Sequence, residues 1–327
     1  MSRDRGLAVL KVAVSAGLLW LILRRFSFEE IKAQVLQTHW SALLVPFAVI
    51  LLSNVLGAVQ WGWLVRHAGL NVRRGRLASL YFIGLFFNHF GVGNLGGDVY
   101  KVYSLGRSEG AMARVAGATL VDRIVSAVAL CSVGFAAAIV SLVRADVATR
   151  VPLATLALAV PVLAAAAVLL HTNWSAAVEK RLLRLSPRVA GRLANVLRSV
   201  RDYQERRGVL RGVLALSLVI QSSRVVAHYL VGLAMGWSMS FADLGKFFLV
   251  IPILGLIIAL PISIGGWGVR EWAGVALFAP LGRQGEESVT LLALNASLTF
   301  VVSLVGGAWF LWSAARSSLR AQKDGDV

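Results

Sequence analysis

The chain has 327 residues, of which 57% are hydrophobic and only 15% are charged, whereas an ordinary soluble domain carries about 25% charged residues. This many apolar side chains cannot be buried in one water-soluble core, so the composition excludes a soluble enzyme, a disordered protein and a coiled coil. Lysine and arginine outnumber acidic residues 33 to 16, which in a membrane protein indicates basic cytoplasmic loops rather than nucleic-acid binding. The sequence therefore predicts an all-α polytopic membrane protein.

Six apolar segments are long enough to cross a bilayer, which takes about 20 residues. The first follows two arginines and has no small-residue cleavage site after it, so we interpret it as an uncleaved span rather than a signal peptide. The six predicted spans are residues 7–23, 42–65, 111–143, 151–170, 212–235 and 289–313.

Two further apolar segments are shorter, and each is interrupted by a pair of glycines. Short, interrupted apolar segments at matching places in two halves are typical of transporters built from an inverted repeat. The interrupted segments cover about 77–90 and 244–260, and their glycine pairs are Gly96-Gly97 and Gly265-Gly266.

We therefore expect one transmembrane domain, residues 1–327, with about six full spans and two re-entrant hairpins. The half-repeats would be residues 1–146 and 147–315. The alternative is that glycine breaks are simply common in membrane helices and that both segments cross fully.

Arginine-rich segments orient the chain. Basic residues concentrate in 66–76, in 171–211 and in the tail after 313. Placing these segments and the N-terminus in the cytoplasm requires an even number of crossings, which both six and eight spans satisfy. We expect a bacterial or archaeal inner-membrane protein with both termini in the cytoplasm.

The segment 171–211 is the only long polar stretch. Leucines and valines recur in it at three- and four-residue steps with arginines between them, the pattern of a basic amphipathic helix. Such a helix can lie on an anionic leaflet. The alternative is a cytoplasmic helical hairpin packed on the protein itself.

Polar residues gather at the first glycine break. Backbone that leaves a helix inside a membrane is tolerated only against protein or a wet cavity, and side chains three apart share a helix face and can pair. The group predicts either a polar cavity for a head group or an ordinary helix N-terminus whose lysine reaches the surface. Its members are Asn88, Gly96, Gly97, Asp98 and Lys101.

Two neighbouring charges, Asp122 and Arg123, interrupt the apolar run 111–143. Charges inside a membrane face a partner or water. Because neighbours in sequence point about 100° apart on a helix, we expect each to meet a charge elsewhere, such as Lys101 for Asp122. The alternative is an anchor near the cytoplasmic end of the span.

Arg270 and Glu271 follow the second glycine break, at Gly265 and Gly266. An arginine that begins a helix at membrane depth is well suited to contact a phosphate. The alternative is an ion pair that holds the two hairpins together, such as Arg270 with Asp98.

The sequence carries no pattern for catalysis, a cofactor or a metal. It lacks a P-loop, a GxSxG turn and a paired acidic motif for a nucleotide sugar. Its five histidines are scattered and its single cysteine, Cys131, lies in an apolar run, so neither a zinc site nor an internal disulfide is expected.

In their order along the chain, three motifs resemble those of the lysylphosphatidylglycerol synthase transmembrane-domain family, which is flippase-like. The resemblance covers about residues 1–315 and implies the lipid-translocating region without the C-terminal aminoacyl-transfer domain. Val92 and Lys101 depart from the family's usual proline and arginine. The motifs are Phe-Phe-Asn-His-Phe at 86–90 with Gly-Gly-Asp at 96–98, Asp-Arg at 122–123, and Pro-Ile-Ser-Ile-Gly-Gly-Trp-Gly-Val-Arg-Glu at 261–271.

The combined hypothesis is a protein that binds or translocates an anionic phospholipid or a polyprenyl-phosphate-linked lipid. Lys101, Arg123 and Arg270 would contact the phosphate, with counter-charges from Asp98, Asp122 and Glu271. The alternatives are a membrane subunit of a glycosyl or aminoacyl transferase and a non-transporting scaffold that recruits a partner enzyme. A homo-oligomer is compatible with each of them.

Overall fold

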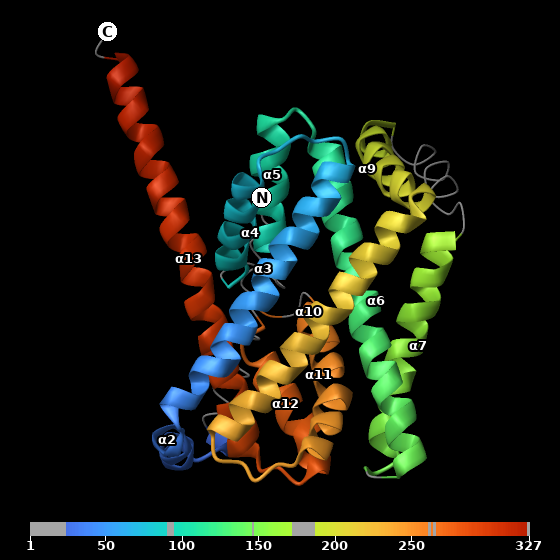
Figure 1. Ribbon diagram of the computed structural model, residues 1–327, viewed down its shortest axis with the longest axis vertical. Helices are drawn as coiled ribbons and strands as arrows, with labels where there is room; N and C mark the ends of the chain where they lie inside the picture. The colour runs from blue at the N-terminus through green and yellow to red at the C-terminus, as the bar shows by residue number, and fades with distance from the viewer. Residues whose placement is uncertain are drawn as a thin grey trace.

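The computed structural model describes residues 24–89, 95–145, 147–171, 187–260, 263 and 266–325, and the side chains of these residues except those of 168–171, 187–193 and 316–325. Every regular element in this part of the chain is helical, which confirms the predicted all-α class (Figure 1). The α-helices are α2 (Phe28–Gln37), α3 (Leu44–His67), α4 (Arg74–Asn88), α5 (Gly96–Ser108), α6 (Met112–Arg144), α7 (Arg150–His171), α9 (Pro187–Glu205), α10 (Arg207–Ala234), α11 (Leu244–Ala259), α12 (Val269–Phe278) and α13 (Gly285–Gly325). The 3-10 turns are η1 (Trp40–Leu43), η2 (Phe241–Asp243) and η3 (Ala279–Leu281).

Six helical stretches of the described chain are long and apolar enough to cross a membrane, which confirms a multi-pass membrane protein. Five of them coincide with predicted spans, while the predicted span 7–23 lies outside the described residues. The sixth contains α11, which the sequence analysis assigned to a broken hairpin. The six stretches are Trp40–His67, Met112–Arg144, Arg150–Ala167, Arg207–Ala234, Phe241–Ala259 and Gly285–Ala315.

Four helices are too short to cross a bilayer alone. They have 10 to 16 residues, or about 15–24 Å at 1.5 Å per residue, against about 30 Å of hydrocarbon. Figure 1 shows α4 beside α5 at one end of the bundle and α11 beside α12 at the other. We call these pairs the first hairpin and the second hairpin. Their re-entrant course in a membrane and the inverted repeat stay predictions, because α11 with η2 also satisfies a crossing by length.

Each hairpin packs on the last long helix of the opposite half of the sequence. Helix α4 packs on α13, and α11 packs on α6. A Cβ added at Gly306 of α13 would lie 1.9 Å from the carbonyl oxygen of Phe82 in α4, and one at Gly134 of α6 would lie 3.0 Å from Pro252 in α11. Both contacts therefore require glycine or nearly so, and the two halves of the sequence interlock.

Helix α9 settles part of the question about the basic segment. Its apolar face is buried against α6, and the hydroxyl of Tyr203 donates a hydrogen bond of 2.7 Å to the carbonyl of Leu64. Burial raises the pKa of this phenol, so Tyr203 stays a neutral donor. The described part of the segment thus packs on the protein itself. Its buried apolar residues are Ala194, Leu197, Val200 and Tyr203, and Ser199 is buried with them.

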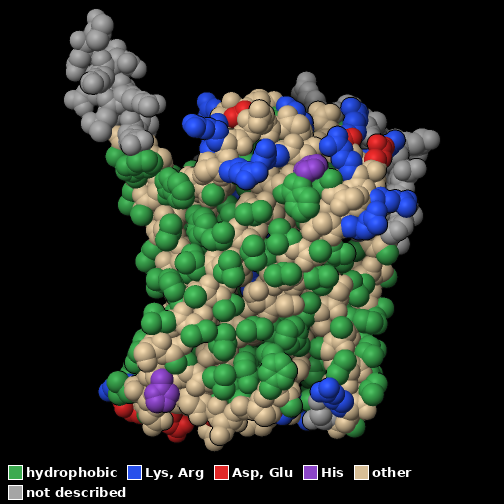
Figure 2. Space-filling view, in the orientation of Figure 1, with side chains coloured by type: hydrophobic (Ala, Val, Ile, Leu, Met, Phe, Trp, Pro, Cys, Tyr) green, Lys and Arg blue, Asp and Glu red, His purple; other side chains and the backbone are tan. Residues whose placement is uncertain are grey.

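Charge is distributed unevenly along the bundle. Figure 2 shows Lys and Arg side chains gathered at the upper end and hydrophobic side chains over the middle, as expected for a bundle with an apolar belt. We call the upper end the basic end. Its exposed arginines include Arg66, Arg73, Arg74, Arg76, Arg107, Arg114, Arg198, Arg201, Arg206 and Arg207.

Candidate functional site

The first hairpin is closed by an unusually tight contact at its tip. The side-chain oxygen Oδ1 of Asn88 accepts a hydrogen bond of 2.8 Å from the backbone N–H of Gly97. A Cβ on Gly97 would lie 1.9 Å from the carbonyl oxygen of Gly84, a distance that no side chain tolerates. Gly97 therefore lets the start of α5 lie directly against α4. This positions the next residue, Asp98, inside the bundle.

Asp98 is the centre of a buried ion-pair network. Its Oδ1 lies 2.8 Å from Nζ of Lys101, and its Oδ2 accepts a hydrogen bond of 2.6 Å from Nε of Arg123. The Lys101 ammonium also lies 5.0 Å from the ring centre of Trp61 and 5.3 Å from that of Tyr81, within the range of a cation–π contact. Lys101 is only 5% exposed, so it is enclosed rather than reaching the surface.

The network continues from Asp98 into two long helices. Oδ1 of Asp122 accepts a hydrogen bond of 2.8 Å from Nε2 of Gln60, whose Oε1 accepts one of 2.8 Å from the Ser217 hydroxyl. The charge of Lys101 also acts on Asp122. The first network, which we define as Asp98, Lys101, Asp122, Arg123, Gln60 and Ser217, thus connects α5, α6, α3 and α10.

The second hairpin carries a smaller and more local ion pair. Gly266 and Gly268 have positive φ angles, +79° and +80°, which favour glycine. The N–H of Gly268 donates to Oε2 of Glu271 at 2.8 Å, so Glu271 caps the start of α12. Oε1 of the same carboxylate accepts a 2.9 Å hydrogen bond from Nε of Arg270, whose guanidinium lies 4.9 Å from the ring centre of Trp267.

Two pairings named from the sequence, the first as an alternative and the second as an example, do not form as direct ion pairs. Asp98 pairs with Lys101 and Arg123, and Arg270 pairs with its neighbour Glu271, so the proposed link between Asp98 and Arg270 does not form. The direct ion partner of Lys101 is Asp98 rather than Asp122. Both errors have the same cause, because the rotation of each helix about its axis decides which charge faces which and the sequence does not give it.

The tip of the first hairpin nevertheless lies near the second. The charge of Arg270 acts on the imidazole of His89, the residue after Asn88, and on that of His228 in α10. Arg224, one turn before His228, acts on the same imidazole. We call His89, Arg224, His228 and Arg270 the arginine–histidine cluster. It contains two arginines, and the neighbouring carboxylate is that of Glu271.

The structure thus distributes the predicted site residues over two groups. Asn88, Gly96 and Gly97 shape the tip of the first hairpin, and the charges of the first network are balanced, two acids against two bases. Arg270 and Glu271 belong to the second hairpin with Gly266, while Gly265 lies outside the described residues. Gln60 is not among the site residues predicted from the sequence. Its one signal was its position as an amide inside an apolar span.

The described residues contain no group of three His, Cys, Asp or Glu side chains that could hold a metal ion. The model of the family "lysylphosphatidylglycerol synthase TM region" matches residues 8–307. The chain belongs to this family. No curated protein matches the chain. The family match includes both hairpins and confirms the resemblance that the three motifs indicated, and it makes this a membrane protein of a lipid-related family.

Proposed function

We propose that the chain binds an anionic phospholipid or a polyprenyl-phosphate-linked lipid and carries its head group across the membrane between the two hairpins. The observation that supports this most is the arginine–histidine cluster, in which Arg270 of the second hairpin is near enough to His89, at the tip of the first hairpin, and to His228 in α10 for its charge to act on both imidazoles. Excess positive charge at membrane depth is costly unless an anion or water meets it. A phosphate is the anion that an arginine fork binds best.

Arg270 is the residue with the most direct role in this proposal. Its side chain is 14% exposed and pairs with a carboxylate that is 5% exposed, so a small part of the arginine stays accessible. A phosphate that contacts this part competes with Glu271 for the guanidinium. Glu271 keeps its hydrogen bond from Gly268 when this happens, so the helix start stays capped while the arginine turns to the ligand.

The first network has a different part in the same proposal. Lys101 is enclosed by Asp98 and two aromatic rings, which leaves a structural role for it. The Arg123 side chain is 45% exposed, so it is the basic group of this network that a head group can reach. The acyl chains would stay in the surrounding lipid throughout.

The test is transport of a fluorescent phosphatidylglycerol in proteoliposomes, with wild type, Arg270→Lys and Arg270→Ala compared. We expect Arg270→Lys to fold normally and to slow transport by roughly tenfold or more, because a point charge replaces a bidentate fork and one charge-assisted hydrogen bond is lost. Arg270→Ala should abolish transport. Size-exclusion profiles identify any variant that has lost its fold.

Arg283 provides a matched control. It also lies beside a glutamate, with 3.9 Å between NH1 and the Glu287 carboxylate, and over a tryptophan ring, with 4.2 Å to the centre of Trp237. It lies between α12 and α13 rather than at a hairpin tip, so Arg283→Lys should transport at the wild-type rate. Folded Arg270→Lys protein that also transports at this rate would overturn the proposal, and a wild type without transport would favour a scaffold.

A further inference from the structure

A long groove lies between α3 and α4 at the basic end, away from the arginine–histidine cluster. Its volume is about 1120 Å³. The α3 side presents Val55, Val59 and Trp63, which repeat at helical spacing on one face, and the α4 side presents Ala78 and Phe82. Val55 is 41% exposed and Val59 is 56% exposed, so the groove opens on the outer surface of the bundle, where lipid would contact it.

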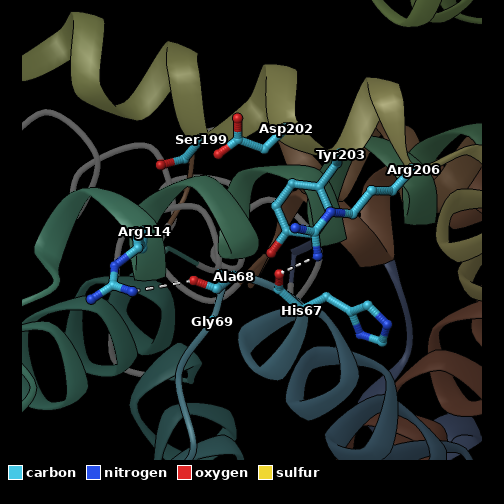
Figure 3. Close-up of a pocket in the computed structure, with 8 residues that line it drawn as sticks. All are labelled: His67, Ala68, Gly69, Arg114, Ser199, Asp202, Tyr203 and Arg206. Atoms are coloured by element: carbon cyan, nitrogen blue, oxygen red, sulfur yellow. Dashed lines mark hydrogen bonds between the residues drawn. The ribbon is translucent and has the colours of Figure 1, made fainter.

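Three arginines line the same groove at its upper end, namely Arg66, Arg74 and Arg206. All three are exposed, and no acidic residue is among the described residues that line the groove. Figure 3 shows Arg206 reaching from the α9–α10 junction to the C-terminal end of α3, where its NH1 donates a 3.0 Å hydrogen bond to the carbonyl of His67. Arg206 is thereby fixed in place, and Asp202, the carboxylate that shares the adjoining pocket with Arg206, does not line the groove.

The dimensions of the groove match one leaflet of a bilayer. From Val55 to Arg66 the α3 helix rises by about 16 Å at 1.5 Å per residue. Half of the hydrocarbon thickness is about 15 Å. When the three arginines lie at the level of the lipid phosphates, the apolar residues of the groove extend about as deep as the acyl chains of that leaflet.

We propose that this groove binds one anionic phospholipid from the leaflet on the basic side. Its phosphate lies among Arg66, Arg74 and Arg206, and one acyl chain lies along Val55, Val59 and Phe82. Charge complementarity identifies this occupant, because the phosphate of an anionic lipid brings net negative charge to the three arginines, whereas a zwitterionic lipid also brings a cation and an apolar protein helix brings no anion. This site goes beyond the proposed function, since none of its residues belongs to the arginine–histidine cluster.

The experiment is photo-crosslinking of the full chain in nanodiscs that contain a trace of phosphatidylglycerol with a diazirine on one acyl chain, followed by peptide mapping. We expect labelling of the peptides around Val55–Val59 and Phe82. Arg66→Gln combined with Arg74→Gln should reduce this labelling roughly tenfold or more, because each arginine near an anionic surface contributes substantially to binding. Val59→Trp, which fills the apolar part, should reduce it as well.

Two control variants match these changes. Arg73→Gln with Arg201→Gln removes the same charge from exposed positions at the basic end that do not line the groove, and Val45→Trp enlarges a side chain that is likewise 56% exposed but lies near the other end of α3. Both should label like wild type. Size-exclusion profiles and transport by Arg66→Gln/Arg74→Gln protein separate a groove defect from a general defect in folding or transport.

Three results would overturn the proposal. The first is equal groove labelling by an otherwise identical phosphatidylcholine probe. The second is labelling that survives in the two groove variants. The third is a crosslink between two copies of the chain at Val59, which would show that protein rather than lipid occupies the groove. Failure of the Arg270 transport experiment has no bearing on any of the three.

Discussion

The two hairpins place their charges in opposite ways. In the first hairpin, Asp98 forms ion pairs with Lys101 on its own helix and with Arg123 on α6, and Asp122 extends the network to α3 and α10. In the second hairpin, Arg270 pairs with the next residue, Glu271, which in turn caps its own helix. The first group of charges connects four helices, whereas the second is complete within one turn.

This difference indicates that the two groups of charges have different roles, one in stabilising the bundle and the other in binding a ligand. Buried charges that bridge helices cannot move to a ligand without loosening the bundle. A local pair can open at low cost, because its carboxylate keeps a second hydrogen bond. We therefore infer that the first hairpin stabilises the bundle and that the second hairpin supplies the cation that meets a ligand.

Removal of Asp98 tests whether the first network stabilises the bundle, and it should have the largest effect on the free energy of unfolding. Asp98→Ala leaves the enclosed Lys101 ammonium without a counter-charge, and we expect the free energy of unfolding to fall by about 3–5 kcal/mol. The Arg123 side chain is 45% exposed and contributes less because water screens it. Thermal unfolding of the purified protein in detergent measures the loss.

Asp243 is the control for this change. It also pairs with a lysine three residues away, with 2.6 Å between Oδ1 and Nζ of Lys246, but both side chains are a quarter to a third exposed. Asp243→Ala should cost about 1–2 kcal/mol, because it removes an exposed ion pair and also the hydrogen bonds that Ser240 donates to this carboxylate. Equal losses for the two aspartates would contradict a structural role specific to the first network.

Substitution of Gly97 tests whether the first hairpin depends on its tight contact. Gly97→Ala forces a methyl group onto the Gly84 carbonyl, which is backbone and cannot swing aside, so we expect a loss of about 1–3 kcal/mol. Gly75, in the same hairpin, has nothing within 4 Å of its virtual Cβ. Gly75→Ala should therefore be neutral or slightly stabilising. The thermal unfolding midpoints of the Gly97→Ala and Gly75→Ala variants test this difference. Similar midpoints would refute the close approach of α4 and α5.

Neutralisation of Glu271 tests the binding role. In Glu271→Gln the amide oxygen can still accept from Gly268, so the unfolding free energy should fall by only about 1–2 kcal/mol, the value of one weakened charge-assisted hydrogen bond. Binding of a labelled anionic lipid should tighten, because Arg270 no longer has a competing carboxylate. Weaker binding would show instead that Glu271 orients Arg270 and that their pair acts as a unit.

Side-specific labelling sharpens the comparison without any change in stability. In a Cys131→Ala background, we expect Glu29→Cys to react with an impermeant thiol reagent in intact cells and Arg201→Cys not to react. Helix α2, which contains Glu29, lies at the end opposite to the basic end (Figure 1). The reverse pattern would place the basic end outside and invert the side from which each hairpin opens.

The sequence predicts the apolar spans and the short broken segments because these depend on composition along the chain. Residues 42–65 and 212–235 needed only the length of an apolar run. The partners of the charges were not predictable in the same way. Asp98 meets Arg123, and Gln60 meets Asp122 across 62 positions of sequence, and such contacts depend on how far each helix is rotated in the bundle. Lys101 was assigned either a cavity or the surface, and its enclosure by two aromatic rings came from packing that the sequence pattern does not contain.

The interlocked halves impose an order of assembly on the chain. Helix α4 docks on α13 through Gly306, which follows Phe82 by roughly 220 residues and is synthesised on the order of 10 to 45 s later at about 5–20 residues per second. During that interval the first hairpin can pack on α3 and α6 but lacks the surface that α13 provides. We therefore expect the nascent chain to depend on the insertion machinery or on a membrane chaperone until its last span is released.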